Sequence, residues 1–300
     1  MATWLLTFLL HRREMKEYLL ELTGLCVRLR SEREIEITDR TRPFVIEQKI
    51  EKEASCITLR TCMKVPEIPI EHHRNGMTIY ASTETSYQLF YLDGKSGQPF
   101  AIVQLYKDGN VTVDYLPEYV RCFQTSSDIL NRVCIEKLFS NHNRMILHAS
   151  FVKYEGRGIL FLGPSGIGKS TQARLWEEAL GANVVNGDRA AVGKDEVWTA
   201  WGIPYAGTSR IYKNEKAPIE AIIILKQGQI NEIEKVRTTQ AFASIYPEVS
   251  LHHWERQFVE EQMEMIHKLT NDIPIYQYSC VPNESAVHFL KAFLEKEREL

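Results

Sequence analysis

One stretch of the chain combines glycine, lysine and hydroxyl residues at a spacing suited to binding phosphate. It matches the pattern G-x-x-x-x-G-K-[ST] and consists of Gly163-Pro164-Ser165-Gly166-Ile167-Gly168-Lys169-Ser170. Glycines let the backbone approach phosphate oxygens closely, and Lys169 adds positive charge at the β- and γ-phosphates. The hydroxyl of Ser170 is suited to ligating Mg²⁺, and Thr171 to contacting the α-phosphate. The sequence therefore predicts a P-loop that binds ATP with Mg²⁺.

The segments on either side of this loop are those that its chemistry requires. Apolar residues 158–162 predict a buried strand before the loop, and an amphipathic helix is expected from Lys169 to about Leu180. The N-terminus of that helix would face the bound phosphates. A chance glycine turn followed by a helix is the alternative, and the flanking strand and helix argue against it.

A carboxylate follows the next predicted strand. Residues 183–185 predict that strand, and Asp188 comes after Asn186 and Gly187 at its end. A crossover connection would bring this end beside the phosphates. Asp188 is therefore a candidate to hold Mg²⁺, directly or through water, or to accept a proton from an attacking hydroxyl. An aspartate that opens an ordinary turn with Arg189 is the alternative.

A second loop is rich in small and hydroxyl residues, as in a lid or a substrate-facing turn. Its members are Gly202, Pro204, Gly207, Thr208 and Ser209. Arg210 follows directly, and a guanidinium there could stabilise the charge that develops on a transferred phosphate. Any surface arginine after such a loop would have the same sequence context.

His148-Ala149-Ser150 precedes the glycine loop and Asn186-Gly187-Asp188-Arg189 follows it, at spacings similar to those of a known family. Over about residues 145–225 the chain resembles the C-terminal catalytic domain of HPr serine kinase/phosphorylase, which is related in fold to ATP-dependent phosphoenolpyruvate carboxykinase. The resemblance implies that His148 lies near the phosphates and that Asp188 activates a seryl hydroxyl. From the residues alone, a single histidine on an apolar strand is more often part of the core.

The chain departs from the family pattern at two places. The family usually carries two adjacent aspartates where this chain has Gly187-Asp188. Its later motif, a glutamate and an arginine before a glycine, corresponds here to Thr199-Ala200-Trp201-Gly202. These departures argue against a phosphorylase activity and against HPr as the substrate.

Residues 1–125 are expected to form a β-rich module. Alternating apolar residues, as in 25–29, 57–60, 87–92 and 110–114, predict antiparallel strands with one buried face. The dipeptides Asp93-Gly94 and Asp108-Gly109 lie between such runs and predict hairpin turns.

Residues 126–300 are expected to form an α/β domain of the HPr kinase and phosphoenolpyruvate carboxykinase type, with the P-loop at its centre. It would begin with a helix that continues to Phe139, because apolar residues recur there at helical spacing after Ser126. A strand over 145–154 precedes the loop strand, and a strong apolar run over 219–225 follows it. An amphipathic helix over 285–297 closes the chain.

The composition argues against several other classes. The 36 basic and 39 acidic residues give a net charge of -3, so no global field attracts nucleic acid or an anionic membrane. Six scattered cysteines form no zinc pattern and fit a reducing cytoplasm.

The apolar residues 1–10 are too short for a membrane span, and Met15 is an alternative start of translation. The pairs His72-His73 and His252-His253 are expected to be solvated.

Two functions of different classes fit these residues, and a third fits less well. The first is a kinase that transfers the γ-phosphate of ATP to a hydroxyl, on a Ser or Thr of a protein or peptide. The second is a nucleotide-binding accessory protein, for instance in peptide maturation, that recruits a partner without kinase turnover. A small-molecule enzyme of carboxykinase type ranks last, because no carboxylate-binding set is evident. Assembly into a homo-oligomer is left open by the sequence.

Overall fold

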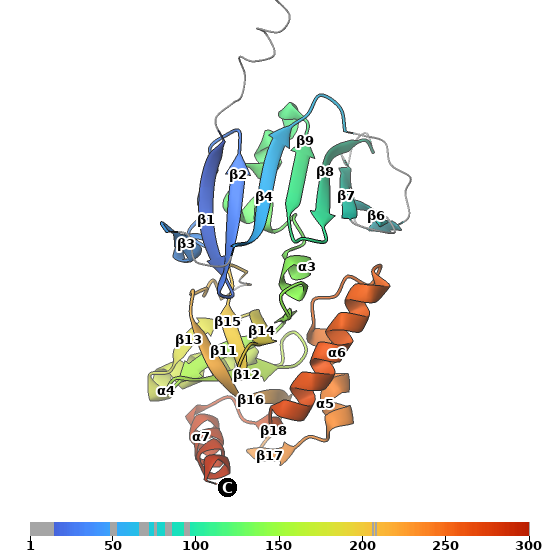
Figure 1. Cartoon of the computed structure of the whole chain (residues 1–300). Coiled ribbons are helices and arrows are strands. Elements are labelled where there is room, and N and C mark those ends of the chain that lie inside the picture. Colours follow the sequence, from blue (N-terminus) through green and yellow to red (C-terminus); the bar gives the residue numbers. More distant parts are fainter. Residues whose placement is uncertain are drawn as a thin grey trace, which may run out of the picture. The chain divides into compact units, whose positions relative to one another are not determined.

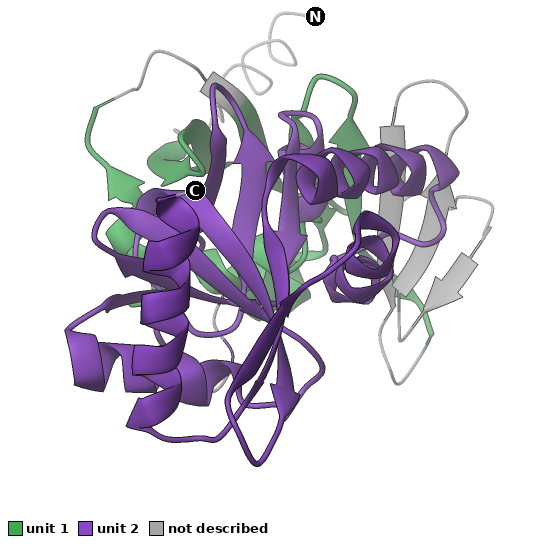
Figure 2. Ribbon diagram, turned by 90° about the horizontal axis from the view of Figure 1, so that it is seen from below, with its two compact units in different colours: residues 1–134 green, residues 135–300 purple. Residues whose placement is uncertain are grey.

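The computed structural model describes residues 15–48, 53–65, 72–74, 77–81, 86–92, 97–205, 207 and 209–299. The chain divides into two compact units, residues 1–134 and residues 135–300 (Figures 1 and 2). Within the described residues, no helix has the length and apolar character needed to cross a membrane. The expected turn at Asp93-Gly94 and the residue Thr208 lie outside the described residues.

The first unit is built on one mixed sheet. In sheet order its strands are β3 (Val45–Ile46), β1 (Lys16–Leu22), β2 (Leu25–Ser31), β4 (Glu53–Thr61), β9 (Val111–Tyr115), β8 (Pro99–Tyr106), β7 (Ser86–Leu92), β6 (Met77–Ala81) and β5 (His72–Arg74). The hairpin between β8 and β9 confirms the turn expected at Asp108-Gly109, where Gly109 has a φ of 86°. The expected antiparallel pairing is confirmed for β1 with β2 and β3 and for β5 through β9, but it is wrong for β4, which pairs in parallel with both β2 and β9. Alternation of apolar residues reports a buried face but not strand direction.

The expected helix over residues 126–139 is interrupted. It forms as α2 (Ser126–Leu130) and α3 (Ile135–Ser140), and Cys134 between them has a φ of 50°. Helix α2 follows the short 3₁₀ helix η2 (Pro117–Phe123) and belongs to the first unit, where the Ser126 hydroxyl accepts a hydrogen bond from the Thr38 amide at 3.1 Å. Another short 3₁₀ helix, η1 (Arg42–Phe44), lies before β3. The division between the units therefore follows Cys134, whereas the sequence placed a boundary before Ser126.

The second unit has a mixed sheet flanked by helices, which makes it an α/β structure as expected. The strands run in the order β10 (Arg144–Leu147), β14 (Ala190–Lys194), β15 (Trp198–Gly202), β16 (Lys216–Gln227), β12 (Arg157–Leu162), β11 (Ser150–Tyr154) and β13 (Asn183–Asn186). Strand β18 (Ile275–Cys280) also pairs with β16, and β17 (Glu232–Lys235) pairs with β18. The long β16 pairs with β15 near its start and with β12 and β18 farther along.

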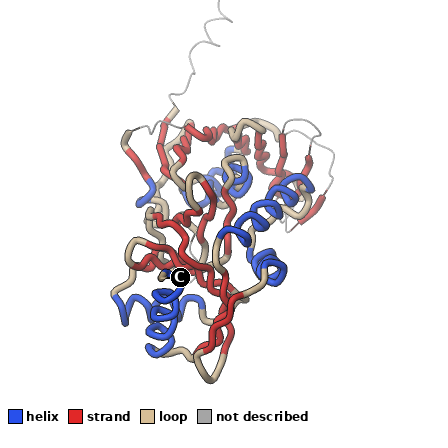
Figure 3. Tube along the Cα trace, turned by 60° about the horizontal axis from the view of Figure 1, so that its bottom comes forward, coloured by secondary structure: helices blue, strands red, loops and turns tan. Residues whose placement is uncertain are grey.

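Two hydrophobic layers hold the helices on opposite faces of this sheet (Figure 3). Helices α4 (Lys169–Leu180) and α7 (Glu284–Arg298) pack on one face, where Trp176 is 1% exposed. Helices α5 (Thr238–Ile245) and α6 (Arg256–Asp272) cover the other, and the 3₁₀ helix η3 (Tyr246–Glu248) follows α5. Neighbouring strand residues alternate between the layers: Ile222 lies in one and Ile223 in the other. The strand that precedes the glycine loop is thus buried on both faces.

The strand expected over 145–154 is two strands. β10 ends at Leu147 and β11 begins at Ser150, so that His148 and Ala149 lie in the break between them. His148 is therefore not a residue within an apolar strand. The break frees its side chain to leave the sheet, and this places it in the group of polar residues described below.

Candidate functional site

The glycine loop connects β12 to α4 and has backbone angles that only glycine adopts easily. Gly166 has a φ of 81°, and Gly168, which caps α4, has a φ of 118°. A Cβ atom added at either residue would meet nothing within 4 Å. Open space therefore lies against this backbone, and the following helix directs its N-terminal N–H groups to the same end. The loop has the shape and the donors that a phosphate group requires.

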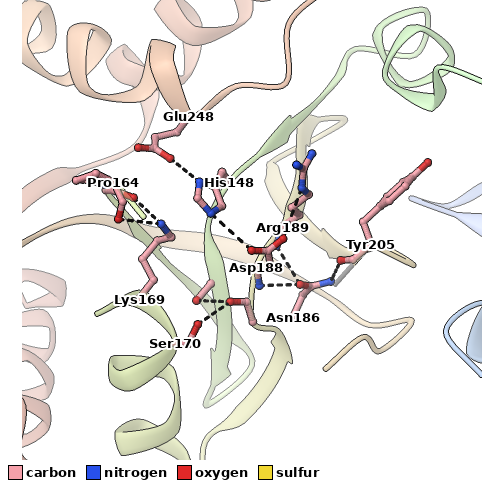
Figure 4. A network of polar contacts seen from close by, with 12 residues as sticks. His148, Pro164, Lys169, Ser170, Asn186, Asp188, Arg189, Tyr205 and Glu248 are labelled. Atoms are coloured by element: carbon pink, nitrogen blue, oxygen red, sulfur yellow. Dashed lines mark hydrogen bonds and ion pairs between the residues drawn. The ribbon is translucent and has the colours of Figure 1, made fainter. Parts of the chain in front are cut away.

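Lys169 is folded back over the loop. Its Nζ donates hydrogen bonds to the carbonyl of Gly163 at 2.5 Å and to that of Pro164 at 3.3 Å, and the residue is 7% exposed (Figure 4). Burial lowers the pKa of Lys169, while the nearby carboxylates of Glu248 and Asp188 act in the opposite direction. Among the described residues, the hydrogen bonds of this buried ammonium group go to these two neutral carbonyls, so an incoming anion would stabilise its charge.

Two hydroxyls converge on one carbonyl oxygen. Ser170 Oγ and Ser150 Oγ donate to the oxygen of Gly187, at 3.1 and 2.8 Å. A Cβ atom at Gly187 would overlap the side chain of Ser209. The start of α4, β11 and the end of β13 are therefore joined at this glycine.

A buried asparagine fixes the turn that carries Asp188. Asn186 is 0% exposed, and its Oδ1 accepts hydrogen bonds from the amides of Asp188 and Arg189 at 2.9 and 3.0 Å. Its Nδ2 donates to the carbonyls of Ile203 and Tyr205 at 3.0 and 2.8 Å. The first two hydrogen bonds fix the turn after β13, and the second two tie the end of β13 to the loop after β15. Asn186 belongs to the motif Asn186-Gly187-Asp188-Arg189, but nothing local in the sequence predicts that its side chain is buried and joins two segments.

The Asp188 carboxylate lies between two basic side chains. Its Oδ1 is 3.6 Å from His148 Nε2, and its Oδ2 is 3.6 Å from Arg189 Nε. Arg189 in turn donates to Ser250 Oγ at 3.1 Å. The backbone of Gly207 lies so close that a Cβ there would approach Asp188 Oδ1 to 2.7 Å. The carboxylate is 29% exposed and therefore accessible.

His148 bridges Asp188 to a second carboxylate. Its Nδ1 is 2.9 Å from Glu248 Oε2, and its amide donates to the Glu248 carbonyl at 2.8 Å (Figure 4). We call these three residues the acid–histidine group. With Nδ1 protonated and donating to Glu248, Nε2 is left to face Asp188. Glu248 lies 100 residues after His148 in η3, outside any motif, so no local sequence signal could have found it.

Several predicted site residues are not joined to this group. Arg210 is exposed with a φ of 53°, and no ion pair links it to the acid–histidine group within the described part of the chain. Thr171 lies in the first turn of α4, facing two cavities rather than the polar network. The phosphate roles of Arg210 and Thr171 remain predictions.

The donor set fits Mg²⁺ bound together with phosphate. Among the described residues, no three His, Cys, Asp or Glu side chains form a group able to hold a metal ion. Magnesium in nucleotide sites takes only one or two protein ligands and completes its shell with phosphate and water oxygens. The Ser170 hydroxyl and the Asp188 carboxylate are oxygen donors of that kind on neighbouring elements.

Comparison with known proteins adds little to this geometry. No protein-family model and no curated protein matches the chain. One matching solved structure is the Hpr(Ser) kinase/phosphatase from Coxiella burnetii, which is 13% identical. The match covers 51% of this chain and 94% of that chain, with a TM-score of 0.31. At that score the likeness is weak, and the functional proposals rest on the site itself.

Proposed function

We propose that the chain binds ATP with Mg²⁺ at the glycine loop and transfers the γ-phosphate to a hydroxyl group, on a Ser or Thr of a protein or peptide. One observation carries the proposal. Asn186 holds the backbone turn that carries Asp188, whose carboxylate lies 3.6 Å from His148 Nε2, and Ser170, next to Lys169, donates a hydrogen bond to the carbonyl of the adjacent Gly187. A candidate base and a phosphate-binding lysine thus share one site beside an open glycine loop.

Each residue of the site would have a distinct role in the reaction. Lys169 and the loop amides would hold the β- and γ-phosphates, while Ser170 would hold Mg²⁺ directly and Asp188 would contact it through water. The metal, when bound, supplies charge neutralisation at the phosphate oxygens. Asp188 would accept the proton of the acceptor hydroxyl as its oxygen bonds to the γ-phosphorus. The bond from that phosphorus to the bridging oxygen breaks, and ADP leaves.

His148 and Glu248 would position this base. The Nδ1 contact to Glu248 fixes the histidine ring, whose Nε2 then faces the Asp188 carboxylate. A proton accepted by Asp188 could pass to this nitrogen. This arrangement gives a single aspartate a partner where a second aspartate is lacking.

The proposal is tested with γ-labelled ATP, Mg²⁺ and candidate peptides or lysate. Asp188→Asn should lower transfer by about 10²- to 10⁴-fold with ATP binding largely kept, because the base is lost. Lys169→Ala should lose both binding and transfer. Asp195→Asn makes the same chemical change at an exposed carboxylate that pairs with Arg144, and should leave transfer unchanged. Unchanged transfer in Asp188→Asn would refute the kinase proposal.

A nucleotide-binding accessory protein is the second candidate, and Gly187 favours it. Ser209 fills the place where a second carboxylate would stand. If ATP binds and no acceptor is labelled, while Asp188→Asn leaves partner capture intact, this second function replaces the first.

A further inference from the structure

A cavity of about 450 Å³ lies beside the glycine loop. Three segments line it: the loop with the first turn of α4, residues 225–228 at the end of β16, and Cys280 with Pro282 after β18. Its volume falls within the ~300–1,000 Å³ that is usual for small-molecule sites. The residues that line this cavity are different from those that form the polar network around Asp188 (Figure 4).

The sheet topology gives this cavity a definite place relative to the phosphate site. Strands β12, β16 and β18 are parallel, so their carboxyl ends meet at one edge, where ligands bind in open α/β sheets. Asp188 follows β13, which lies on the other side of β12, beyond β11. A triphosphate that directs its γ-phosphate toward Lys169 and Asp188 therefore extends in the opposite direction, toward the ends of β16 and β18.

We infer that this cavity holds the adenine base of the bound nucleotide and that Gln172 recognises its amino group. The inference rests on the proposed function. Gln172 lines the cavity and is 3% exposed. Its Nε2 donates to Cys280 Sγ at 3.2 Å, but its Oε1 is buried with no hydrogen-bond partner among the described residues.

An unpaired amide oxygen in a buried position is unfavourable unless a ligand supplies a donor. The terminal torsion of glutamine is broad, so a small rotation can present this oxygen to the cavity. The 6-amino group of adenine is a donor, whereas guanine carries a carbonyl oxygen at the same position. Apolar atoms of Ile167, Leu225 and Pro282 offer surfaces for the ring.

A second cavity, of about 350 Å³, serves as a control. It is lined by Ser170, Gly187, Ser209 and Ile211, among others, and thus lies on the β13 side of α4. Because the acceptor side of the site is there, filling this cavity should leave nucleotide affinity intact. The two cavities share only Thr171.

The test compares ATP, GTP and inorganic tripolyphosphate in equilibrium binding to the full chain with Mg²⁺. Wild type should bind ATP more tightly than the other two. Gln172→Met, which keeps the shape of the side chain, should weaken ATP binding about 3- to 10-fold and leave the affinity for tripolyphosphate unchanged. Its melting temperature without nucleotide should not fall, since an unpaired polar atom is removed. Wild type should bind N6,N6-dimethyl-ATP about as weakly as Gln172→Met binds ATP. Gln172→Met should bind this analogue no more weakly than it binds ATP.

Filling each cavity completes the experiment. Cys280→Trp, which would fill the first cavity, should weaken ATP binding at least about 10-fold, while tripolyphosphate still binds. Ile211→Trp, the matched control, should bind ATP as wild type does. If ATP affinity is unchanged in Gln172→Met and Cys280→Trp but falls in Ile211→Trp, the inference about the adenine site is overturned. ATP binding at the glycine loop would still be supported. If neither ATP nor tripolyphosphate binds to wild type, the proposed function itself fails and the inference with it.

Discussion

Ser209 occupies the space next to Gly187 that a second carboxylate would need. A Cβ atom at residue 187 would overlap both the hydroxyl and the Cβ of Ser209. The carbonyl of Gly187 is also the shared acceptor of Ser150 and Ser170. This glycine therefore has a steric role, in addition to marking a departure from the two-aspartate pattern.

Gly187→Ala should lower the free energy of unfolding by about 1–3 kcal/mol, measured by urea denaturation. Without a steric clash, replacing glycine by alanine at an ordinary φ stabilises a protein by ~0.4–1 kcal/mol, because it lowers the conformational entropy of the unfolded chain. A loss of stability would therefore be attributable to the overlap with Ser209. Adding Ser209→Gly should restore most of the loss, and Ser209→Gly alone is the control. Wild-type stability in Gly187→Ala would show that the loop moves away freely.

At this scale the sequence predicted the residues that belong to a local pattern. The loop from Gly163 to Ser170 could be expected from its motif, whereas a place for His148 near the phosphates was implied only by the family resemblance. Glu248 and Asn186 could not be expected, because their roles arise from contacts with residues distant in the chain. A buried asparagine and an exposed turn asparagine look the same until the segment that covers them is placed.

Charged and aromatic contacts join helix α3 to the segment that leads into α6. Lys137 Nζ lies 2.6 Å from Glu255 Oε1, and His252 Nε2 lies 3.7 Å from the Glu136 carboxylate. His252 is 8% exposed and stacks on Trp254 and Phe258, with centroids 4.8 and 4.7 Å apart. The expectation that His252 is solvated is therefore wrong, since aromatic neighbours bury its ring.

The stability contributed by Glu136 should depend on pH. Burial would raise the pKa of Glu136, but the nearby His252, together with smaller contributions from a backbone hydrogen bond and from the charge of Arg189, outweighs it and holds the pKa below its ordinary value of 4.5. The ionised carboxylate then stabilises the fold above pH 4.5, and this contribution is lost as the pH falls through the lowered value. Glu136→Gln should be less stable than wild type at pH 6, and the difference should shrink by pH 3.

Urea midpoints at pH 6, 5, 4 and 3 measure this difference. Glu196→Gln, at an exposed glutamate between β14 and β15, is the control and should follow wild type throughout. A constant gap between Glu136→Gln and wild type across these pH values would contradict the assignment.

Element positions were predictable where local signals were strong. The helix expected from Lys169 to about Leu180 has these bounds in α4, and Gly181 caps its end with a φ of 62°. The breaks at Cys134 and His148 were not predictable, since the apolar spacing continues across both. Neither was the parallel pairing of β4 with β2 and β9, which depends on the connections between strands.

On the scale of the whole molecule, the candidate site is confined to the second unit. Every residue of the glycine loop, the acid–histidine group and the 450 Å³ cavity lies within residues 135–300. That unit has hydrophobic layers of its own on both faces of its sheet. The first unit supplies none of these groups.

Residues 135–300 alone should therefore bind ATP with a Kd within about threefold of that of the full chain. Isothermal calorimetry measures the affinity, and a cooperative thermal transition verifies that the fragment is folded. Lys169→Ala in the fragment is the control for binding at the loop. A folded fragment that binds no ATP, beside a full chain that does, would show that the first unit contributes to the site.

Strand β16 pairs with β12 on one side and with β18 on the other, and this has a consequence during protein synthesis. Its apolar residues 222–225 pair with β18, whose first residue, Ile275, comes 50 residues after Leu225 in the chain. At ribosomal rates of ~5–20 residues per second, this interval lasts about 3–10 s. Throughout it, one edge of an isoleucine-rich strand has no partner from its own chain and can pair with another nascent chain. Chaperone capture or a slowed codon stretch over residues 226–275 would then decide how much of the protein reaches its native state.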